Sequence, residues 1–242
     1  MSSILSSKQE DAGLVEDYRQ WKAMGQGGTS RNWTGYMSQV AAGKTKAFGA
    51  DETIKPGFYE NPEKRATGWK KATEQQKANA RKSFLKETLP IRPGPRAKAK
   101  PYVFPQRERN ADHPQDPAVK QAYLEAFDKL CEINTDTEWK TSVLEKHGQA
   151  LFVKSSVPLS PLVGPSSREI CHIHSTDLSG HVTLSFIDAE DVISKGWGER
   201  HRLSGTDWIH IGFTMLYVPN TIEETEILIK IFQAGIDYMK SG

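Results

Sequence analysis

The clearest pattern of apolar and polar positions lies in the last third of the chain. Three segments there have the length and the alternation of β-strands. Two others carry apolar residues at helical spacing, and the second opens with Thr221 and Glu224 at the spacing of a capping box. The predicted strands are residues 168–175, 180–187 and 208–219, and the predicted helices are residues 188–196 and 221–240.

This β-β-α-β-α order predicts an α+β fold, with helices packed on one face of a mixed or antiparallel sheet. The preceding part of the chain reads as a helical half with one further strand. In the last of its helices, Phe127, Leu130 and Ile133 are core candidates. The expected helices are residues 10–24, 31–42, 62–88 and 117–147, the last as one long or two shorter helices, and the expected strand is residues 149–156.

A proline-rich arm separates the N-terminal helices from the predicted sheet. Five prolines fall within residues 90–105. Because proline fixes φ and lacks an amide hydrogen, we expect an extended path across the surface of the fold. Ile91, Tyr102 and Val103 give this arm apolar side chains with which to dock.

The domain organisation follows from these elements. We predict a disordered start over residues 1–9 and a single domain over residues 10–242. Within that domain, residues 10–116 form a helical and extended basic region, and residues 117–242 form an α+β catalytic core. The chain is long enough to bury a substantial core.

Composition places the protein among globular chains, with 37% hydrophobic and 26% charged residues. No apolar run approaches the roughly 20 residues that span a bilayer, and no secretory signal is evident. The two cysteines, Cys131 and Cys171, lie far apart, which is typical of a reducing compartment. The expected location is therefore the cytoplasm.

Charge is distributed unevenly along the chain. Between Glu63 and Arg109 there are fourteen Lys or Arg and four Asp or Glu, although the whole chain has a net charge of only +2. Such a run can mark an anionic partner, nucleic acid included. Aromatic residues are sparse within it and no reading motif accompanies it, so we expect no nucleic-acid partner and interpret the run as solvated surface.

Histidines gather in the predicted sheet. His172 and His174 share one face of a strand, and His181 begins the neighbouring strand across a short turn. If Cys171 and Ile173 face the core, the two imidazoles point toward solvent or a cavity. Three interpretations stay open: a metal site, general acid–base chemistry, or structural histidines. We expect no bound metal.

A second motif, "KGWGERH", follows the predicted helix. Its two glycines have a structural explanation, since one ends a helix and the other permits a tight turn. Glu199, Arg200 and His201 come directly after that turn and are held in fixed directions. A guanidinium there can bind a carboxylate or an enolate oxygen, and the imidazole can act as a base.

Three blocks of the chain together resemble the fungal luciferase family. They are "EDYRQWKAMGQGGTSRNWTGY" near the start, "LPIRPGPRAKAKPYVFPQRER" in the middle, and the C-terminal block that runs from "REICHIH" through "GWGERH" to "YVPNTIEE". Their order and rough spacing match the family over most of the chain. The segment from "GWGERH" to "YVPNTIEE" is the most specific part.

The resemblance implies a cofactor-independent oxygenase that adds molecular oxygen to a 3-hydroxyhispidin-like pyrone or aromatic enol, with possible light emission. Such chemistry requires a base, donors for the enolate oxygens and a pocket that excludes water. The catalytic candidates are His172, His174, His201, Arg200 and Glu199, and the substrate-binding candidates are His181, Trp197, Tyr217, Phe213, Arg96 and Arg107.

The chain also departs from the luciferase pattern. Luciferases carry an apolar N-terminal anchor, whereas this sequence begins with polar residues, so no membrane anchor is expected in this chain. Asp177 falls near the place where luciferases have a further histidine. Two alternatives therefore stay open: a non-oxidative tailoring enzyme of fungal secondary metabolism (an isomerase, cyclase or hydrolase), or a non-catalytic protein that binds a small molecule or an anion.

Overall fold

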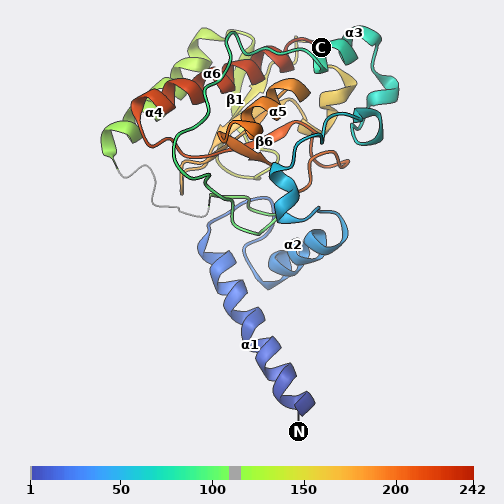
Figure 1. Cartoon of the computed structure of the whole chain (residues 1–242), viewed down its shortest axis with the longest axis vertical. Coiled ribbons are helices and arrows are strands. Elements are labelled where there is room, and N and C mark those ends of the chain that lie inside the picture. Colours follow the sequence, from blue (N-terminus) through green and yellow to red (C-terminus); the bar gives the residue numbers. More distant parts are fainter. Residues whose placement is uncertain (1, 109–115) are drawn as a thin grey trace.

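A computed structural model describes residues 2–108 and 116–242, with side chains from residue 13 onward. In this part of the chain, six strands form one antiparallel sheet in the order β1-β2-β3-β4-β6-β5 (Figure 1). The strands are β1 (Thr137–Thr141), β2 (Gln149–Val153), β3 (Glu169–Ile173), β4 (Gly180–Thr183), β5 (Gly198–Arg200) and β6 (Phe213–Leu216). The α-helices are α1 (Ser2–Ala23), α2 (Trp33–Thr45), α3 (Glu74–Ala80), α4 (Pro117–Ile133), α5 (Phe186–Ser194) and α6 (Ile222–Met239).

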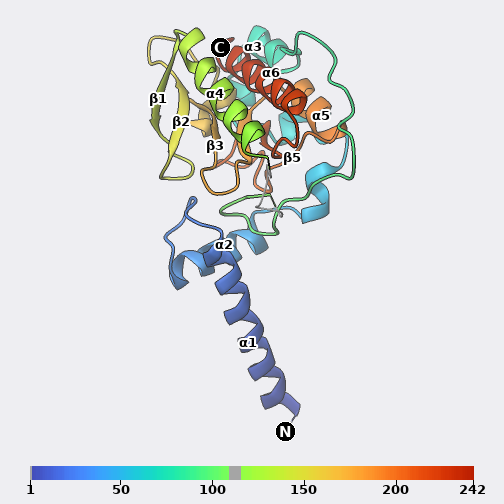
Figure 2. The same ribbon diagram turned by 90° about the vertical axis from the view of Figure 1, so that its left-hand side faces the viewer.

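The long helices cover one face of the sheet, which confirms the predicted α+β architecture. Helix α6 lies on β3 and β4, and α4 packs beside α6 (Figure 2). Contact between α6 and the sheet is close at Gly235, where an added Cβ would lie 2.4 Å from Val182 Cγ2. Helix α5 packs against β5 at the end of the sheet.

The proline-rich arm covers the opposite face. Val103 and Phe104 pack there against Leu203, Ile209 and Phe213, in a small apolar cluster separate from the main core. The extended path predicted for residues 90–105 is confirmed, since no helix or named strand falls within it. Docking through Ile91 is wrong: that side chain is 80% exposed. The arm therefore forms a lid of apolar side chains over the face that the helices leave open.

The same arm joins the N-terminal helices to the body. Trp21 of α1 donates from Nε1 to the Phe104 carbonyl at 2.6 Å, and Tyr102 packs with Trp21 and Tyr36. Helix α1 extends away from the body in both views (Figures 1 and 2). The sequence predicts a disordered start over residues 1–9. Of these residues, those from Ser2 onward lie within α1.

The single helix predicted over residues 62–88 is wrong. Two 3₁₀ turns, Pro62–Lys64 and Trp69–Lys71, and the short α3 stand in its place. The interruption is at Gly68, which has φ 87° and approaches the Pro161 carbonyl so closely that a Cβ would lie 2.2 Å from its oxygen. A tertiary contact that only glycine permits thus breaks the helical run.

The end of the helix predicted over residues 117–147 is also wrong. Helix α4 ends at Ile133, whose side chain is 71% exposed rather than in the core, whereas Phe127 and Leu130 are buried as predicted. Strand β1 follows, and a turn at Gly148, with φ 71°, leads into β2. The sequence also gave no sign of β5, a strand of three residues.

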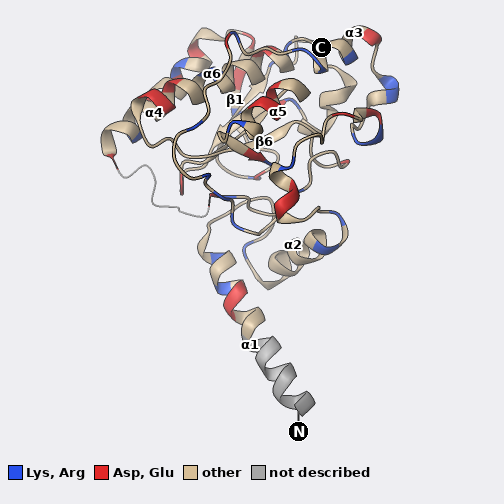
Figure 3. Cartoon of the chain, viewed as in Figure 1, with Lys and Arg blue, Asp and Glu red and all other residues tan. Residues whose placement is uncertain are grey.

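Charged residues of both signs are interspersed over the body (Figure 3). Three arginines of the basic run turn inward: Arg92 pairs with Glu224, Arg107 pairs with Glu145, and Arg96 donates to the Gly198 carbonyl. Part of the run is therefore internal, whereas the sequence alone had indicated solvated surface for the whole run. Among the described residues, no helix has both the length and the apolar content needed to cross a bilayer.

Candidate active site

Strand pairing brings the histidines of β3 and β4 together. His172 lies directly opposite His181 in the antiparallel register, and His174 follows directly after the end of β3. The ring centroids are 5.0 Å apart for His172 and His174, 5.2 Å for His172 and His181, and 4.9 Å for His174 and His181. His201 follows at 5.8 Å from His181. All four candidate imidazoles of the sequence thus form one cluster.

The cluster is buried, so the solvent-facing orientation considered for His172 and His174 does not occur. The four side chains belong to residues between 2% and 4% exposed. Phe213 stacks on His181 with centroids 4.8 Å apart, and Phe104 of the arm lies 6.0 Å from the His201 ring. The sequence pattern predicted an extended arm but did not predict that it covers this face.

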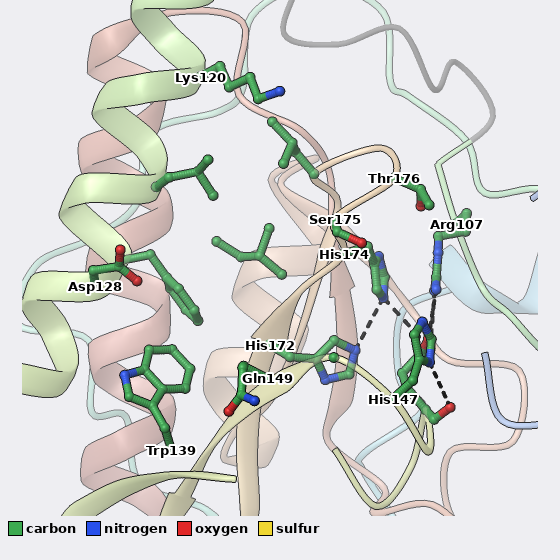
Figure 4. Close-up of a pocket in the computed structure, with 16 residues that line it drawn as sticks. Arg107, Lys120, Asp128, Trp139, His147, Gln149, His172, His174, Ser175 and Thr176 are labelled. Atoms are coloured by element: carbon green, nitrogen blue, oxygen red, sulfur yellow. Dashed lines mark hydrogen bonds and ion pairs between the residues drawn. The ribbon is translucent and has the colours of Figure 1, made fainter. Parts of the chain in front are cut away.

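A cleft of about 380 Å³ reaches the cluster from one side (Figure 4). It lies between α4 and the strand ends, where the β1–β2 and β3–β4 turns meet. His172, His174 and Arg107 lie at one end of it, and Phe127 and Trp139 form an aromatic wall at the other end, on the helix-covered side of the sheet. The other lining residues are Lys120, Leu124, Asp128, Glu145, His147, Gly148, Gln149, Ile173, Ser175, Thr176 and Leu178.

A buried carboxylate orients His172. Glu169 Oε1 lies 2.8 Å from His172 Nδ1, and Glu169 itself is fully buried. Residues 169 and 172 would face opposite sides of a regular strand. The pairing of β2 with β3 skips Ile170, however, and this bulge turns Glu169 to the face of His172. The backbone amide of Val143 and the Ser142 hydroxyl also donate to Glu169.

A second acid orients His174. Its Nδ1 lies 2.9 Å from Ser179 Oγ, and Ser179 Oγ donates to Asp177 Oδ2 at 2.8 Å. Burial raises the pKa of Asp177, but His174 and Arg107 outweigh it and the pKa is lowered. Asp177 is thus an ionised acceptor, and its oxygens also take the Glu108 amide.

Arg107 supplies the positive charge of the site. It forms a two-pronged pair with Glu145, at 3.1 Å and 2.6 Å. Burial raises the pKa of Glu145, but Arg107 and the nearby histidines hold it at about 2. The Arg107 Nε is buried and has no hydrogen-bond partner among the described residues.

Three histidines of the cluster, His174, His181 and His201, are held neutral. Burial lowers the pKa of His174 to about 4, and Arg107 lowers it further in the same direction. Burial also lowers the pKa of His201 to about 4 and brings that of His181 well below its usual value, with His174 and His172 adding to the effect at His181. Neutral imidazoles keep a nitrogen lone pair for a proton or a metal ion.

Arg200 does not join the histidines, contrary to the sequence-based expectation. Because residues 198–200 form β5, successive side chains alternate, and Arg200 points to the helix-covered face. Its guanidinium donates to the carbonyls of Glu52 at 2.8 Å and of Thr53 at 3.2 Å. Arg107 takes the place at the cluster for which Arg200 was considered.

Three further candidates gather elsewhere. Glu199, Tyr217 and Arg96 line a separate cavity of about 170 Å³ beneath the arm. Tyr217 donates to Glu199 Oε2 at 2.8 Å, and burial raises the pKa of Glu199. These groups form an internal polar network outside the histidine cleft.

Trp197 belongs to the main core rather than to a substrate wall. It is 1% exposed, and its Nε1 donates to the Pro90 carbonyl at 2.7 Å. Phe213 packs behind His181 and does not line the cleft.

Sequence reasoning missed the acids of the site and its aromatic wall. Glu145 and Trp139 were assigned to a helix, although "TEWKT" and "QALFV" flanking a glycine-containing turn are a hairpin signal. Glu169 lay within the recognised motif, but its role depends on a bulge that no local pattern announces.

Comparison with known proteins finds similarity to luciferases in this part of the chain. The sequence profile described as Luciferase domain matches residues 167–235, which include β3, β4 and the histidine pair. The resemblance to fungal luciferases is confirmed. The luciferase of Neonothopanus nambi is 33% identical over 168 residues, covering 62% of this chain and 61% of that protein. The luciferases of Armillaria gallica and Armillaria mellea show the same identity and coverage.

The chain therefore spans about three-fifths of the length of the curated relatives it matches. No solved structure matches it. The residues that match the Luciferase domain profile include His172, His174, His181 and His201, while Arg107 and Glu145 come to the same cluster from outside the matched residues.

Proposed function

We propose that this protein is an oxygenase of the fungal luciferase type that acts on a small pyrone or aromatic enol and needs no cofactor. The observation that supports this most strongly is a cleft with a carboxylate-anchored imidazole at one end and an aromatic wall at the other. A cleft with apolar walls and a few polar groups at one end suits a flat, acidic ring.

His172 is the proposed base. Its Nδ1 is fixed on Glu169, so its Nε2 carries the lone pair, as in hydrolytic triads in which a carboxylate orients the catalytic imidazole. His174 is less suited, because burial holds its pKa at about 4. Arg107 lines the same end of the cleft, and its free Nε–H is the proposed donor to the enolate oxygen.

The proposed reaction begins when His172 takes the proton of the enol hydroxyl. The resulting enolate donates electron density to molecular oxygen, and a carbon–oxygen bond forms at the electron-rich ring carbon. The peroxide then closes on the ring carbonyl and displaces the ring oxygen, which takes the proton back from His172. The O–O bond and the neighbouring carbon–carbon bond break, and carbon dioxide is lost. One atom of the molecular oxygen leaves in carbon dioxide and the other stays in the ring-opened product, so the step needs no external reductant.

The test is turnover of 3-hydroxyhispidin in air by the purified chain, with oxygen uptake, carbon dioxide release and light recorded together. Oxygen uptake with carbon dioxide release is expected, and light is expected with it if the product forms in an excited state. Conversion of the compound at an equal rate without oxygen would instead indicate the non-oxidative alternative. No conversion under either condition would contradict the proposal for this substrate class.

A further inference from the structure

Three imidazoles and a carboxylate converge in the cluster from three separate segments. His172 comes from β3, His174 directly follows that strand, His181 comes from β4, and Glu145 comes from the turn before β2. Each offers one nitrogen or oxygen atom, and these atoms all lie within 4.8 Å of one another. The directions of the surrounding hydrogen bonds determine which ring nitrogens carry a hydrogen and which carry a lone pair.

The Nδ1 atom of His172 must carry a hydrogen. Its partner, the Glu169 carboxylate, is an acceptor, which also takes hydrogens from Ser142 Oγ and the Val143 amide. The neutral ring therefore has its lone pair on Nε2.

The Nδ1 atom of His174 must carry a hydrogen as well. Ser179 Oγ gives its own hydrogen to Asp177, so it accepts from the imidazole. The lone pair of His174 is then also on Nε2.

Two lone pairs consequently face each other, because the Nε2 atoms of His172 and His174 are 3.2 Å apart. Such an arrangement repels unless a proton or a metal cation lies between them. Two imidazole nitrogens bound to one tetrahedral metal ion are roughly 3.3 Å apart, given metal–nitrogen distances of about 2.05 Å. The third imidazole, of His181, has a buried Nδ1 with no hydrogen-bond partner among the described residues.

The local charge is also unbalanced. Apart from the imidazoles, the contacting groups are three carboxylates, of Glu145, Glu169 and Asp177, and one guanidinium, of Arg107. Their sum is two negative charges in a buried place, which a divalent cation would neutralise.

We propose that His172, His174 and His181, with Glu145 as the fourth ligand, bind a divalent first-row transition metal ion of the zinc type. Imidazole and carboxylate ligands suit such ions, and the contacts of Glu169 and Asp177 are those that orient metal-binding histidines. Arg107 donates to both Glu145 oxygens, and Oε1, which lies 3.8 Å from His174 Nε2, keeps a second lone pair for the metal.

The metal would occupy the lone pair that the proposed base uses. One consequence rests on the proposed function: zinc should inhibit turnover, because it competes with the proton of the substrate for His172 Nε2. Binding itself is measured without substrate, so failure of the proposed function leaves the metal test intact.

The test uses the full chain, stripped with a chelator and titrated with Co²⁺, whose visible absorption reports tetrahedral ligation, and then with Zn²⁺ in competition. One ion per chain is expected. His172→Gln and His174→Gln should weaken binding at least 100-fold, whereas His210→Gln, which changes a buried histidine outside the cluster, should leave it unchanged. Equal affinity in all three variants, or no saturable binding by the parent chain, would overturn the proposal.

A second measurement covers the case in which the glutamine variants do not fold. In the unaltered chain, imidazole nitrogen resonances are followed by NMR during Zn²⁺ addition. The rings of His172, His174 and His181 should shift together at one equivalent, and those of His147 and His210 should not. Shifts confined to His147, or to histidines outside the cluster, would contradict the assignment.

Discussion

At the scale of single residues, the acids around the imidazoles define the site. Glu169 does not line the cleft, yet it fixes the hydrogen on His172 Nδ1. Asp177 does the same for His174 through Ser179. The tautomers of the two histidines therefore depend on acids that do not line the cleft.

Glu169→Gln tests this positioning role. We expect kcat to fall at least 100-fold with KM nearly unchanged, because the amide can rotate its NH₂ toward His172 and favour the wrong tautomer. Steady-state kinetics on the proposed substrate measure both constants, and Glu226→Gln, at an exposed position on α6, is the matched control. A change in KM alone would show that Glu169 shapes the cleft rather than the base.

Trp197 is the residue whose loss should harm stability most simply. Its ring is in the main core, so Trp197→Ala should lower the free energy of unfolding by about 3–5 kcal/mol. Trp208 is 51% exposed, and Trp208→Ala should change it by less than about 0.5 kcal/mol. Urea denaturation compares the two, and similar losses would mean that Trp197 is not a core residue.

At the scale of elements, the close approach of α6 to the sheet is the main constraint. A Cβ at Gly235 would lie 2.4 Å from Val182 Cγ2 and 2.9 Å from the Thr183 carbonyl oxygen. Helix α6 can therefore rest on β4 only where it has no side chain.

Gly235→Ala should destabilise the protein by roughly 1–3 kcal/mol, because the backbone of β4 cannot give way. Gly13→Ala, in the exposed part of α1 with nothing within 4 Å, is the control and should be neutral or slightly stabilising. Thermal melts followed by circular dichroism compare them. An unchanged midpoint for Gly235→Ala would show that α6 sits further from the sheet.

Elements with a strong period could be predicted from the sequence. Helix α6 starts at the capping threonine, Thr221, and β3 and β4 hold the histidines on one face as expected. Elements set by distant contacts could not. The contact of Gly68 with Pro161 breaks a helical pattern, and β5 is a strand only because β6 lies beside it.

The candidate site also has features that local sequence predicts and features that depend on distant contacts. Strand alternation correctly grouped His172, His174 and His181, which is local information. The orientation of Arg200 was not predicted, because β5 was not recognised as a strand. The contact between Glu169 and His172 was not predicted either, because it depends on a β-bulge. Burial of the cluster depends on an arm whose docking face no periodicity encodes.

At the scale of the whole molecule, several neutral histidines are enclosed between the sheet and its coverings. Burial lowers the pKa of His210 to about 3, and those of His174 and His201 to about 4. In the unfolded chain these groups take up protons near pH 6.5. Their contribution to stability is thus fully present above that pH and is lost as the pH falls toward the folded values.

His210→Gln isolates one such group, because the other titrating residues, including Glu108, whose pKa burial raises to about 7, are common to both proteins. Between about pH 6 and pH 4, the free energy of unfolding of the parent should fall more steeply than that of the variant by about 1 kcal/mol per pH unit. Denaturation at a series of pH values measures the slopes. Parallel slopes would show that His210 is protonated in the folded protein.

The proposed function depends most directly on one step, in which His172 removes a proton from a bound enol. Its most direct test is an anaerobic absorption titration with 3-hydroxyhispidin, at a pH where the free compound is neutral. The parent chain and His210→Gln should show the spectrum of the bound enolate, and His172→Gln should show that of the neutral enol. A neutral spectrum with the parent chain, or an enolate spectrum with His172→Gln, would contradict the assignment of the base.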